Sequence, residues 1–402
     1  MGEIIRILKN RIRLLIELVE LPLIVLIALV SRLAPRSVDI GLGPMPLINN
    51  VYHKKALIQH GYSTETFVDD IWFITNEFDH KFIPTSSLLR RLLRETHFVF
   101  LFAIFRYRCL YVYFNGGPLY ATAILWRFEP QIYRLAGVRT VIMPYGGDVQ
   151  DLMRTPNLLL RHGMARDYPL QRHIRNTIAK KIDIWISHAD HVISGCDWVE
   201  YMHFWHTLMV AHFSIDTQRW QPGLEIAPSY PARPLRVLHA PNHKGIKGSE
   251  FFIRAVNELR DEGESIELVL VQKLPNDEIR QLIDTVDIVA DQLIFGWYAM
   301  FAIEAMAMGK PVLCYIREDF ERLYIDAGLL KENEIPLINC TPRNVKSTLR
   351  MLMRDPARLK DAGKRGPNYV RRHHSVEAVG AVFADINKAI GIVPRADMEV
   401  RP

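Results

Sequence analysis

The sequence predicts an α/β protein of two domains, each with a parallel sheet covered by helices on both faces, and an extra hydrophobic helix at the N-terminus. Three observations lead to this prediction. Short apolar runs that end in glycine or proline alternate with longer helical segments. A proline-rich break, Gln221–Pro234, divides this alternation into two series. The length of 402 residues is sufficient for two or three domains.

The hydrophobic helix is expected over Leu14–Val30, which has the sequence LLIELVELPLIVLIALV. It is borderline for a membrane span of about 20 residues. Glu17, Glu20 and Pro22 interrupt it, which disfavours a clean span. Basic residues on both sides favour a helix at the membrane interface instead: Arg6, Lys9, Arg11, Arg13, Arg32 and Arg36. The alternative is a buried N-terminal helix of a soluble fold.

The first series of elements precedes the proline-rich break. Buried strands ending in glycine-rich turns are expected at Val38–Gly43, Cys109–Gly117, Thr140–Asp148 and His191–Gly195. Helices are expected at Asn49–His60, Leu88–Phe105, Leu119–Leu135 and Leu170–Lys181. This alternation is typical of a parallel sheet with both faces covered.

The second series follows the break and has the same character. Strands are expected at residues 235–241, 266–272, 288–294 and 311–316, and helices at 250–262, 277–285 and 299–308, with two more helices after them. In such sheets ligands bind at the carboxyl ends of the strands. We therefore expect a ligand cleft between the two domains.

Composition narrows the class of protein. Hydrophobic residues make up 49% and charged residues 23%, which excludes a disordered, collagen-like or multi-span membrane chain. The net charge of +6 is compatible with anionic lipid or a phosphorylated ligand, and nucleic acid is not an expected partner. Cys109, Cys196, Cys314 and Cys340 are widely spaced, which indicates a reducing, cytoplasmic compartment rather than a disulfide framework.

The segment Asp291–Val312, DQLIFGWYAMFAIEAMAMGKPV, is the most informative stretch. An apolar strand, a turn at Gly296 and a helix beginning near Ala299 place free N–H groups and a positive helix end together, which suits a diphosphate. Glu304 lies among apolar residues of this helix, where sugar hydroxyls would provide its partners. The alternative is that Glu304 faces solvent.

A second stretch, His239–Gly248, follows a predicted strand and precedes a helix. Lys244 and Lys247 lie beside glycines in this turn, and Ser249 is a suitable N-cap for the helix. Lysines at such a turn can hold phosphate oxygens by charge-assisted hydrogen bonds.

These residues resemble a family. KGSEFFIRAVNEL followed by FGWYAMFAIEAMAMGKPV resembles the donor half of a family-4-type retaining glycosyltransferase. MPYGGDVQDL resembles the family's turn in the first domain, SIDTQRWQP its entry to the linker, and PNYVRRHHSVEAVGAVFADI its closing helix. The resemblance covers about nine-tenths of the chain, from Val38 onward.

The resemblance implies the GT-B architecture, in which two Rossmann-like doubly wound domains face a cleft, here with the extra N-terminal hydrophobic helix. It divides the chain into a membrane-associating helix at 1–36, an acceptor domain at 37–229, a nucleotide-sugar domain at 230–378, and a C-terminal helix at 379–402 that crosses back to the first domain.

The resemblance also implies roles for residues at matching positions. Lys247 would hold the donor diphosphate, with Lys244 in place of an arginine whose expected position is occupied by Pro241. Glu304 would bind ribose hydroxyls, whereas Gly296 replaces the family's first glutamate. Asp148 is expected to meet an acceptor hydroxyl, beside Gly147. The expected donor-binding residues are Gly43, Lys244, Gly296, Trp297, Tyr298, Met300 and Phe301, mainly through backbone amides at 298–301.

The function implied is glycosyl transfer with retention from a nucleotide-diphosphate sugar to a glycan or lipid-linked acceptor, in surface polysaccharide or glycolipid biosynthesis. The protein is expected to be cytoplasmic, peripheral or monotopic at the inner face of the cell membrane. No D-x-D sequence occurs, so no metal cofactor is expected. The alternatives are a sugar epimerase or a non-catalytic nucleotide-sugar-binding protein on the same fold.

Two groups of histidines carry other hypotheses. His203 and His206, with His212 nearby, have a spacing found in metal sites, but no carboxylate or cysteine lies in register, so packing is the preferred interpretation. His373 and His374 are expected on a solvated helix face, with a phosphate contact as the alternative.

Overall fold

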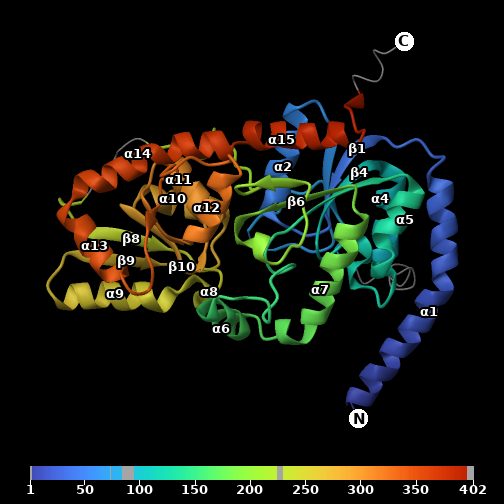
Figure 1. Cartoon of the computed structure of the whole chain (residues 1–402), viewed down its shortest axis with the longest axis horizontal. Coiled ribbons are helices and arrows are strands. Elements are labelled where there is room, and N and C mark those ends of the chain that lie inside the picture. Colours follow the sequence, from blue (N-terminus) through green and yellow to red (C-terminus); the bar gives the residue numbers. More distant parts are fainter. Residues whose placement is uncertain (1, 73, 84–94, 224–229, 396–402) are drawn as a thin grey trace.

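The computed structural model describes residues 2–72, 74–83, 95–223 and 230–395. Figure 1 shows two α/β lobes side by side, with the first half of the chain in one and most of the second half in the other. A long N-terminal helix, α1 (Gly2–Ser31), runs along the outer side of the first lobe, away from the second (Figure 1).

The first lobe is built on a seven-stranded parallel sheet with the order β3-β2-β1-β4-β5-β6-β7. The central strand β4 has the sequence YRCLYVY and is buried on both faces, as aromatic and aliphatic residues in a covered parallel sheet should be. The strands are β1 (Val38–Leu42), β2 (Thr64–Val68), β3 (His80–Lys81), β4 (Tyr107–Tyr113), β5 (Arg139–Met143), β6 (His191–Gly195) and β7 (Thr207–Met209).

Helices connect these strands. They are α2 (Ile48–Gln59), α4 (Glu95–Arg106), α5 (Glu129–Ala136), α6 (Leu158–Asp167) and α7 (Gln171–His188), with short 3-10 helices η1 (Pro118–Ala121), η2 (Leu125–Arg127) and η3 (Cys196–Glu200). Part of the helix expected at Leu88–Phe105 and part of the Gln221–Pro234 linker lie outside the described residues.

The continuous helix expected over Leu119–Leu135 is wrong. The segment forms η1 and η2, and an α-helix begins only at Glu129. The hydroxyl of Thr122 accepts the N–H of Trp126, and the carboxylate of Glu17 from α1 accepts the N–H groups of Ala123 and Ile124. Side chains therefore bond to backbone groups that a continuous helix would have paired internally.

The second lobe has a five-stranded parallel sheet with the order β12-β11-β10-β8-β9. The strands are β8 (Leu235–His239), β9 (Ile266–Leu270), β10 (Ile288–Gly296), β11 (Val312–Ile316) and β12 (Ile338–Asn339). The helices are α8 (Lys244–Lys247), α9 (Ser249–Asp261), α10 (Asn276–Asp284), α11 (Met300–Ala307), α12 (Glu318–Asp326), α13 (Val345–Arg354), α14 (Pro356–His373) and α15 (Val376–Ala389).

The chain returns to the first lobe at its C-terminal end. α14 and α15 run along one edge of the molecule, and α15 packs on α2 of the first lobe (Figure 1). At the crossing point, Ile215 donates its N–H to the carbonyl of His374 at 2.7 Å, and Val376 donates to the carbonyl of Ile215 at 3.1 Å. The two lobes are thus joined by backbone pairing as well as by the linker.

Candidate active site

The candidate site lies at the carboxyl ends of β8 and β10 in the second sheet. The strand order changes direction between these two neighbours, because β9 follows β8 outward on one side and β11 and β12 follow β10 on the other. In doubly wound sheets a crevice opens at this point, above the carboxyl ends of the strands. The turns that follow β8 and β10 carry the residues that the sequence singled out.

Lys247 is held in place by a buried carboxylate. Its Nζ donates a 2.7 Å hydrogen bond to Oδ1 of Asp291, a β10 residue that is 1% exposed. The other oxygen of Asp291 accepts the N–H of Ala299, the N-cap residue of α11, at 3.4 Å. One carboxylate therefore connects the lysine to the N-terminus of α11, where the positive end of the helix and a cation lie together.

The first turn of α11 supplies backbone donors. Its first intrahelical pair joins the N–H of Ile303 to the carbonyl of Ala299. The N–H groups of Met300 and Phe301 come before this pair and have no acceptor within the helix. Both residues are partly exposed, and free N–H groups at a helix N-terminus suit an anionic ligand.

Lys244 opens the short helix α8, and this turn contacts the first lobe. The N–H of Ile246 donates to Oδ2 of Asp167, at the end of α6, at 2.8 Å. The ring of His243 lies 4.4 Å from the ring of Tyr168, measured between centroids. Contacts from the first lobe therefore set the conformation of the lysine-containing turn.

Glu304 does not face solvent, so that alternative is wrong. The residue is 4% exposed, and its Oε1 accepts a 2.8 Å hydrogen bond from Nδ2 of Asn276, at the start of α10. Burial raises the pKa of Glu304 to about 8, although Asn276 and the charge of Arg219 oppose this shift. The carboxyl group is therefore largely protonated at neutral pH and can both donate and accept hydrogen bonds.

A cavity of about 470 Å³ lies between the lobes and is lined by Asn276, the hydrogen-bond partner of Glu304. Asn276 and Arg219 line it from one side, and Tyr52 and Trp72 line it from the first lobe. The Oδ1 atom of Asn276 is buried and has no hydrogen-bond partner among the described residues. A ligand with N–H or O–H groups in this cavity would provide one.

The turn after β10 is fixed by side-chain contacts to the first lobe and to the end of α14. The indole Nε1 of Trp297 donates to the carbonyl of Val210 at 3.2 Å. The Tyr298 hydroxyl lies 2.7 Å from the Tyr369 hydroxyl and 2.9 Å from Nε2 of His374. Trp297 and Tyr298 are 1% and 2% exposed, so only their backbone could contact a donor.

His374 is not on a solvated helix face, and that expectation is wrong. It is fully buried, and its Nδ1 lies 3.2 Å from the carbonyl of Phe213. Since a carbonyl only accepts, Nδ1 carries the proton and Nε2 accepts from Tyr298. Burial lowers the pKa of His374 to about 3, which keeps the ring neutral. Its neighbour His373 pairs with Glu334 at 2.8 Å.

In the first lobe, Asp148 supports the turn after β5. Oδ1 accepts the N–H groups of Tyr145 and Gly146, and Oδ2 accepts that of Phe114, each at 2.9 Å. The residue is 1% exposed, and burial raises its pKa to about 7. Its carboxylate therefore does not reach the surface where an acceptor would bind, whereas Gly147 in the same turn is partly exposed.

Gly43 follows β1, at the point where the order of the first sheet changes direction. A Cβ on this residue would lie 2.1 Å from the carbonyl oxygen of Phe67, so only glycine fits. The peptide bond between Gly43 and Pro44 is cis. This turn therefore lies at the carboxyl edge of the first sheet, in the position that corresponds to the turns after β8 and β10 of the second.

Solved structures resemble this arrangement over most of the chain. Sucrose-phosphate synthase from Thermosynechococcus elongatus has a TM-score of 0.58 and 14% identity, and the match covers 88% of this chain and 98% of that one. HepE from Anabaena, in complex with UDP and glucose, has a TM-score of 0.57 and 12% identity, with 88% and 100% covered. A glycosyltransferase from Rickettsia africae has a TM-score of 0.51 and 12% identity, with 88% and 98% covered.

The chain has the GT-B fold. No protein-family model and no curated protein matches the sequence. The predicted architecture of two Rossmann-like domains and an extra N-terminal apolar helix is confirmed. At these identities the likeness establishes the fold alone. The chemistry has to be inferred from the residues of this chain.

Within the GT-B fold, Gly296 differs from the family pattern for a structural reason. Its φ is +96°, and a Cβ there would lie 2.5 Å from Cδ of Arg317. Arg317 in turn pairs with Glu200 of the first lobe at 2.5 Å and packs on Phe320. The space beside the turn is thus filled by an arginine that bridges the lobes, and a glutamate at 296 has no room.

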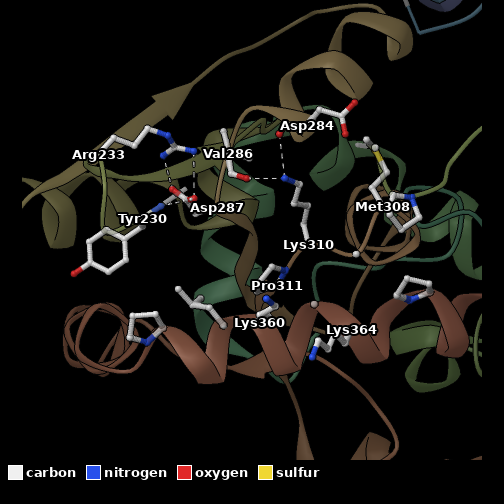
Figure 2. Close-up of a pocket in the computed structure, with 17 residues that line it drawn as sticks. Tyr230, Arg233, Asp284, Val286, Asp287, Met308, Lys310, Pro311, Lys360 and Lys364 are labelled. Carbon is white, nitrogen blue, oxygen red and sulfur yellow. Dashed lines mark hydrogen bonds and ion pairs between the residues drawn. The ribbon is translucent and has the colours of Figure 1, made fainter. Parts of the chain in front are cut away.

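A larger cavity of about 690 Å³ lies at the opposite edge of the second sheet (Figure 2). Its lining includes residues 284–287, before β10, and 309–311, before β11, so it adjoins the amino ends of the strands. There Lys310 donates to the carbonyls of Asp284 and Val286 at 3.1 and 2.9 Å, and Arg233 pairs with Asp287 (Figure 2). This cavity is therefore separate from the candidate site.

Sequence reasoning missed the partners of the two motif residues. Asp291 and Asn276, which bond to Lys247 and Glu304, come from β10 and α10, and the cavity residues Arg219 and Tyr52 come from the chain before the linker and from α2; none stands out by spacing. Only Asp291 carried a signal, as an acidic residue inside an apolar strand next to the motif. Across the described residues no group of three or more His, Cys, Asp or Glu is arranged to hold a metal ion, and His206 instead accepts the N–H of Val192.

Proposed function

We propose that this protein is a glycosyltransferase that moves a sugar from a nucleotide-diphosphate donor to a glycan or lipid-linked acceptor, with retention at the anomeric carbon. The observation that carries the proposal is the Lys247–Asp291–Ala299 connection, which places a cation beside the N-terminus of α11 at the switch point of the second sheet. A diphosphate is the ligand that fits such a site.

In this proposal Lys247, Lys244 and the N–H groups of Met300 and Phe301 hold the diphosphate. They stabilise the negative charge that develops on it as the bond to the sugar breaks, which is electrostatic stabilisation by groups already in place. Glu304 and Asn276 bind ribose hydroxyls, consistent with a protonated carboxyl group and an unpaired amide oxygen at the edge of a cavity. Asp148 acts indirectly, as a positioning residue that shapes the turn containing Gly147.

We further propose that the protein works as a peripheral or monotopic protein at the inner face of the cell membrane, in surface polysaccharide or glycolipid synthesis. The support is the apolar helix over Arg11–Ser31, of which only 22% is buried. The fold of HepE, whose structure contains UDP and glucose, agrees with a nucleotide-sugar donor.

The loss of the family's first glutamate favours a second candidate, a protein that binds nucleotide-sugar without transferring it. Gly296 cannot supply the carboxylate, and Arg317 occupies the adjacent space. A sugar epimerase on the same fold is a third possibility, and the product distinguishes all three.

The test begins with a thermal-shift screen of nucleotide-sugars, since a ligand that binds the folded state raises its melting temperature. The stabilising donor is then incubated with and without lipid-linked acceptors, and the product is analysed by NMR for its anomeric configuration. Transfer with retention supports the proposal, whereas an isomerised nucleotide-sugar indicates an epimerase, and binding without conversion indicates the non-catalytic candidate.

Lys247→Ala and Glu304→Ala should each lower kcat/KM by at least about tenfold, or about 1.4 kcal/mol. Lys360→Ala is the matched control, because this exposed lysine lines the separate cavity at the other edge of the sheet. Wild-type turnover in both site variants would refute the assignment.

A further inference from the structure

One face of α1 is fitted to the first lobe. Glu17, Ala28 and Ser31 are 0% exposed and Ile24 is 6% exposed, and their spacing places them on the same side of the helix. The Glu17 carboxylate accepts the N–H groups of Ala123 at 2.9 Å and Ile124 at 2.7 Å. This contact explains why an apolar helix contains a glutamate at its centre.

A second acidic residue of the helix, Glu20, also faces the first lobe. Glu20 pairs with His97 of α4 at 3.3 Å. Both acidic side chains between residues 11 and 33 are therefore directed to the first lobe. The exposed apolar side chains of α1 lie on the other side.

We call that other side the outer face of α1. Its residues recur every three or four positions and lie on one side of the helix. They are Ile12 (48% exposed), Leu15 (61%), Val19 (79%), Leu23 (58%), Leu26 (57%) and Val30 (54%), and Leu33 (87%) follows in the turn after the helix. A contiguous stripe of this kind marks an interaction surface, whereas isolated exposed aliphatic residues do not. The helix is therefore apolar on its outward side as well as on the side that packs against the lobe, unlike an ordinary surface helix.

The charges beside the outer face identify its partner. Arg11 and Arg32 lie at its two ends and are exposed. The outer face has no acidic residue, because Glu17 and Glu20 are directed to the first lobe. Two copies of α1 packed face to face would bring arginines together without carboxylates to pair them. Anionic lipid headgroups provide the missing negative charge, and their acyl chains accept the aliphatic side chains.

We infer that α1 lies flat in the headgroup region of an anionic leaflet, with its outer face in the lipid and Glu17 holding it against the first lobe. This inference rests on the membrane attachment proposed above and adds its geometry. The contacts of Glu17, Ile24 and Ser31 fix about 20 Å of the helix axis along the protein surface. A transmembrane arrangement would require Glu17 and Glu20 to leave their partners and enter the bilayer core.

Vesicle flotation of the full-length protein tests the surface. We expect the protein to float with phosphatidylcholine vesicles that contain phosphatidylglycerol, and to bind pure phosphatidylcholine vesicles more weakly. The double variant Val19→Asp/Leu26→Asp should lower the partition coefficient by at least about tenfold, because it places charge on the outer face. The matched control is Leu158→Asp/Leu170→Asp, at positions that are 71% and 73% exposed elsewhere on the first lobe. Both variants alter exposed side chains, and thermal melting confirms that they fold.

Cysteine labelling tests the orientation. Cys109, Cys196, Cys314 and Cys340 are buried, so a single introduced cysteine provides the accessible thiol. With Arg11→Cys or Arg32→Cys protein bound to sealed vesicles, an impermeant maleimide added outside should label both positions. Protection of one position would show that the helix spans the bilayer and would overturn the inference.

Three other results would also overturn it: no vesicle binding by the full-length chain, equal loss in the Leu158/Leu170 control, or a stable dimer that the outer-face substitutions dissociate. None of these measurements uses sugar transfer. Their failure is therefore distinguishable from failure of the proposed glycosyltransferase activity.

Discussion

Lys247, at the end of α8, and Asp291, in β10, form an ion pair of 2.7 Å. The Asp291 side chain is fully buried, and that of Lys247 is 18% exposed. This pair sets the position of the cation relative to the N-terminus of α11. It also makes the lysine a structural residue as well as a candidate ligand-binding one, so experiments on it must separate the two roles.

Lys247→Ala alone should destabilise the protein by roughly 3–5 kcal/mol, because it leaves the Asp291 carboxylate buried without its partner. The double variant Lys247→Met/Asp291→Asn removes both charges and should recover most of that loss. If Lys247 also binds the diphosphate, UDP affinity stays low in the double variant even though stability returns. Urea denaturation and calorimetric titration with UDP measure the two effects. Recovery of UDP binding together with stability would contradict a direct role for Lys247.

Glu304 should make stability depend on pH in a defined window. Its pKa is raised from an ordinary value near 4.5 to about 8 by burial. Between these values the folded state binds a proton that the unfolded state has lost, so the free energy of unfolding falls as pH rises, by up to about 1.4 kcal/mol per pH unit.

Glu304→Gln removes this titration and should make the decline between pH 4.5 and 8 shallower than in the wild type. The control is Glu278→Gln, an exposed glutamate in α10. Denaturation curves collected across this range test the prediction. Parallel pH profiles for wild type and Glu304→Gln would show that Glu304 is ionised in the folded protein.

Restoring the family's first glutamate should not improve activity. Gly296 has a φ of +96°, and a Cβ there approaches Cδ of Arg317 to 2.5 Å. Gly263 has a φ of +88° and open space around its Cβ position, so Gly263→Ala measures the backbone cost alone, about 1 kcal/mol. Gly296→Ala should cost a further 1–3 kcal/mol or so because Arg317 must move.

Gly296→Glu should destabilise the protein, as Gly296→Ala does. It should also lower nucleotide-sugar binding, because Arg317 would be displaced from its ion pair with Glu200. Thermal melting and ligand titration measure both effects. A gain of transfer activity in Gly296→Glu would show that the space beside the turn is available to a side chain.

Tyr298→Phe should loosen the packing of the turn after β10 against the C-terminal end of α14. The hydroxyl bridges Tyr369 and His374, and its removal leaves two buried polar groups short of a partner. The expected loss of stability is about 1–3 kcal/mol. Tyr315→Phe is the control, at a partly exposed tyrosine whose hydroxyl has no partner in the part of the chain that the structure describes. Equal melting temperatures for the two variants would contradict a structural role for the bridge.

Much of the fold follows from local sequence patterns. Apolar runs such as RTVIM of β5 and helical periods such as that of α9 indicate their structures without any partner, because strand and helix periods act over a few residues. The long helix of residues 2–31 is equally local. The exception at Leu119–Leu135 arose because Glu17, more than 100 residues away, bonds to the backbone of that segment.

The candidate site shows the same division. The sequence determined that Lys247 and Glu304 belong to a turn and a helix that follow two strands of the second sheet. Only the tertiary structure decided that Asp291 pairs with the lysine, that Asn276 pairs with the glutamate, and that Arg317 fills the space beside Gly296. Such pairings join segments that are distant in the chain, and spacing along the sequence carries no information about them.

The N-terminal helix gives the last example. Its composition is apolar all round. The sequence therefore predicts that the helix contacts an apolar environment, but it does not predict which side of the helix makes that contact. The tertiary structure decided this, because buried carboxylates require hydrogen-bond donors. The first lobe offers such donors to Glu17, and His97 pairs with Glu20, which leaves the aliphatic side of the helix outward.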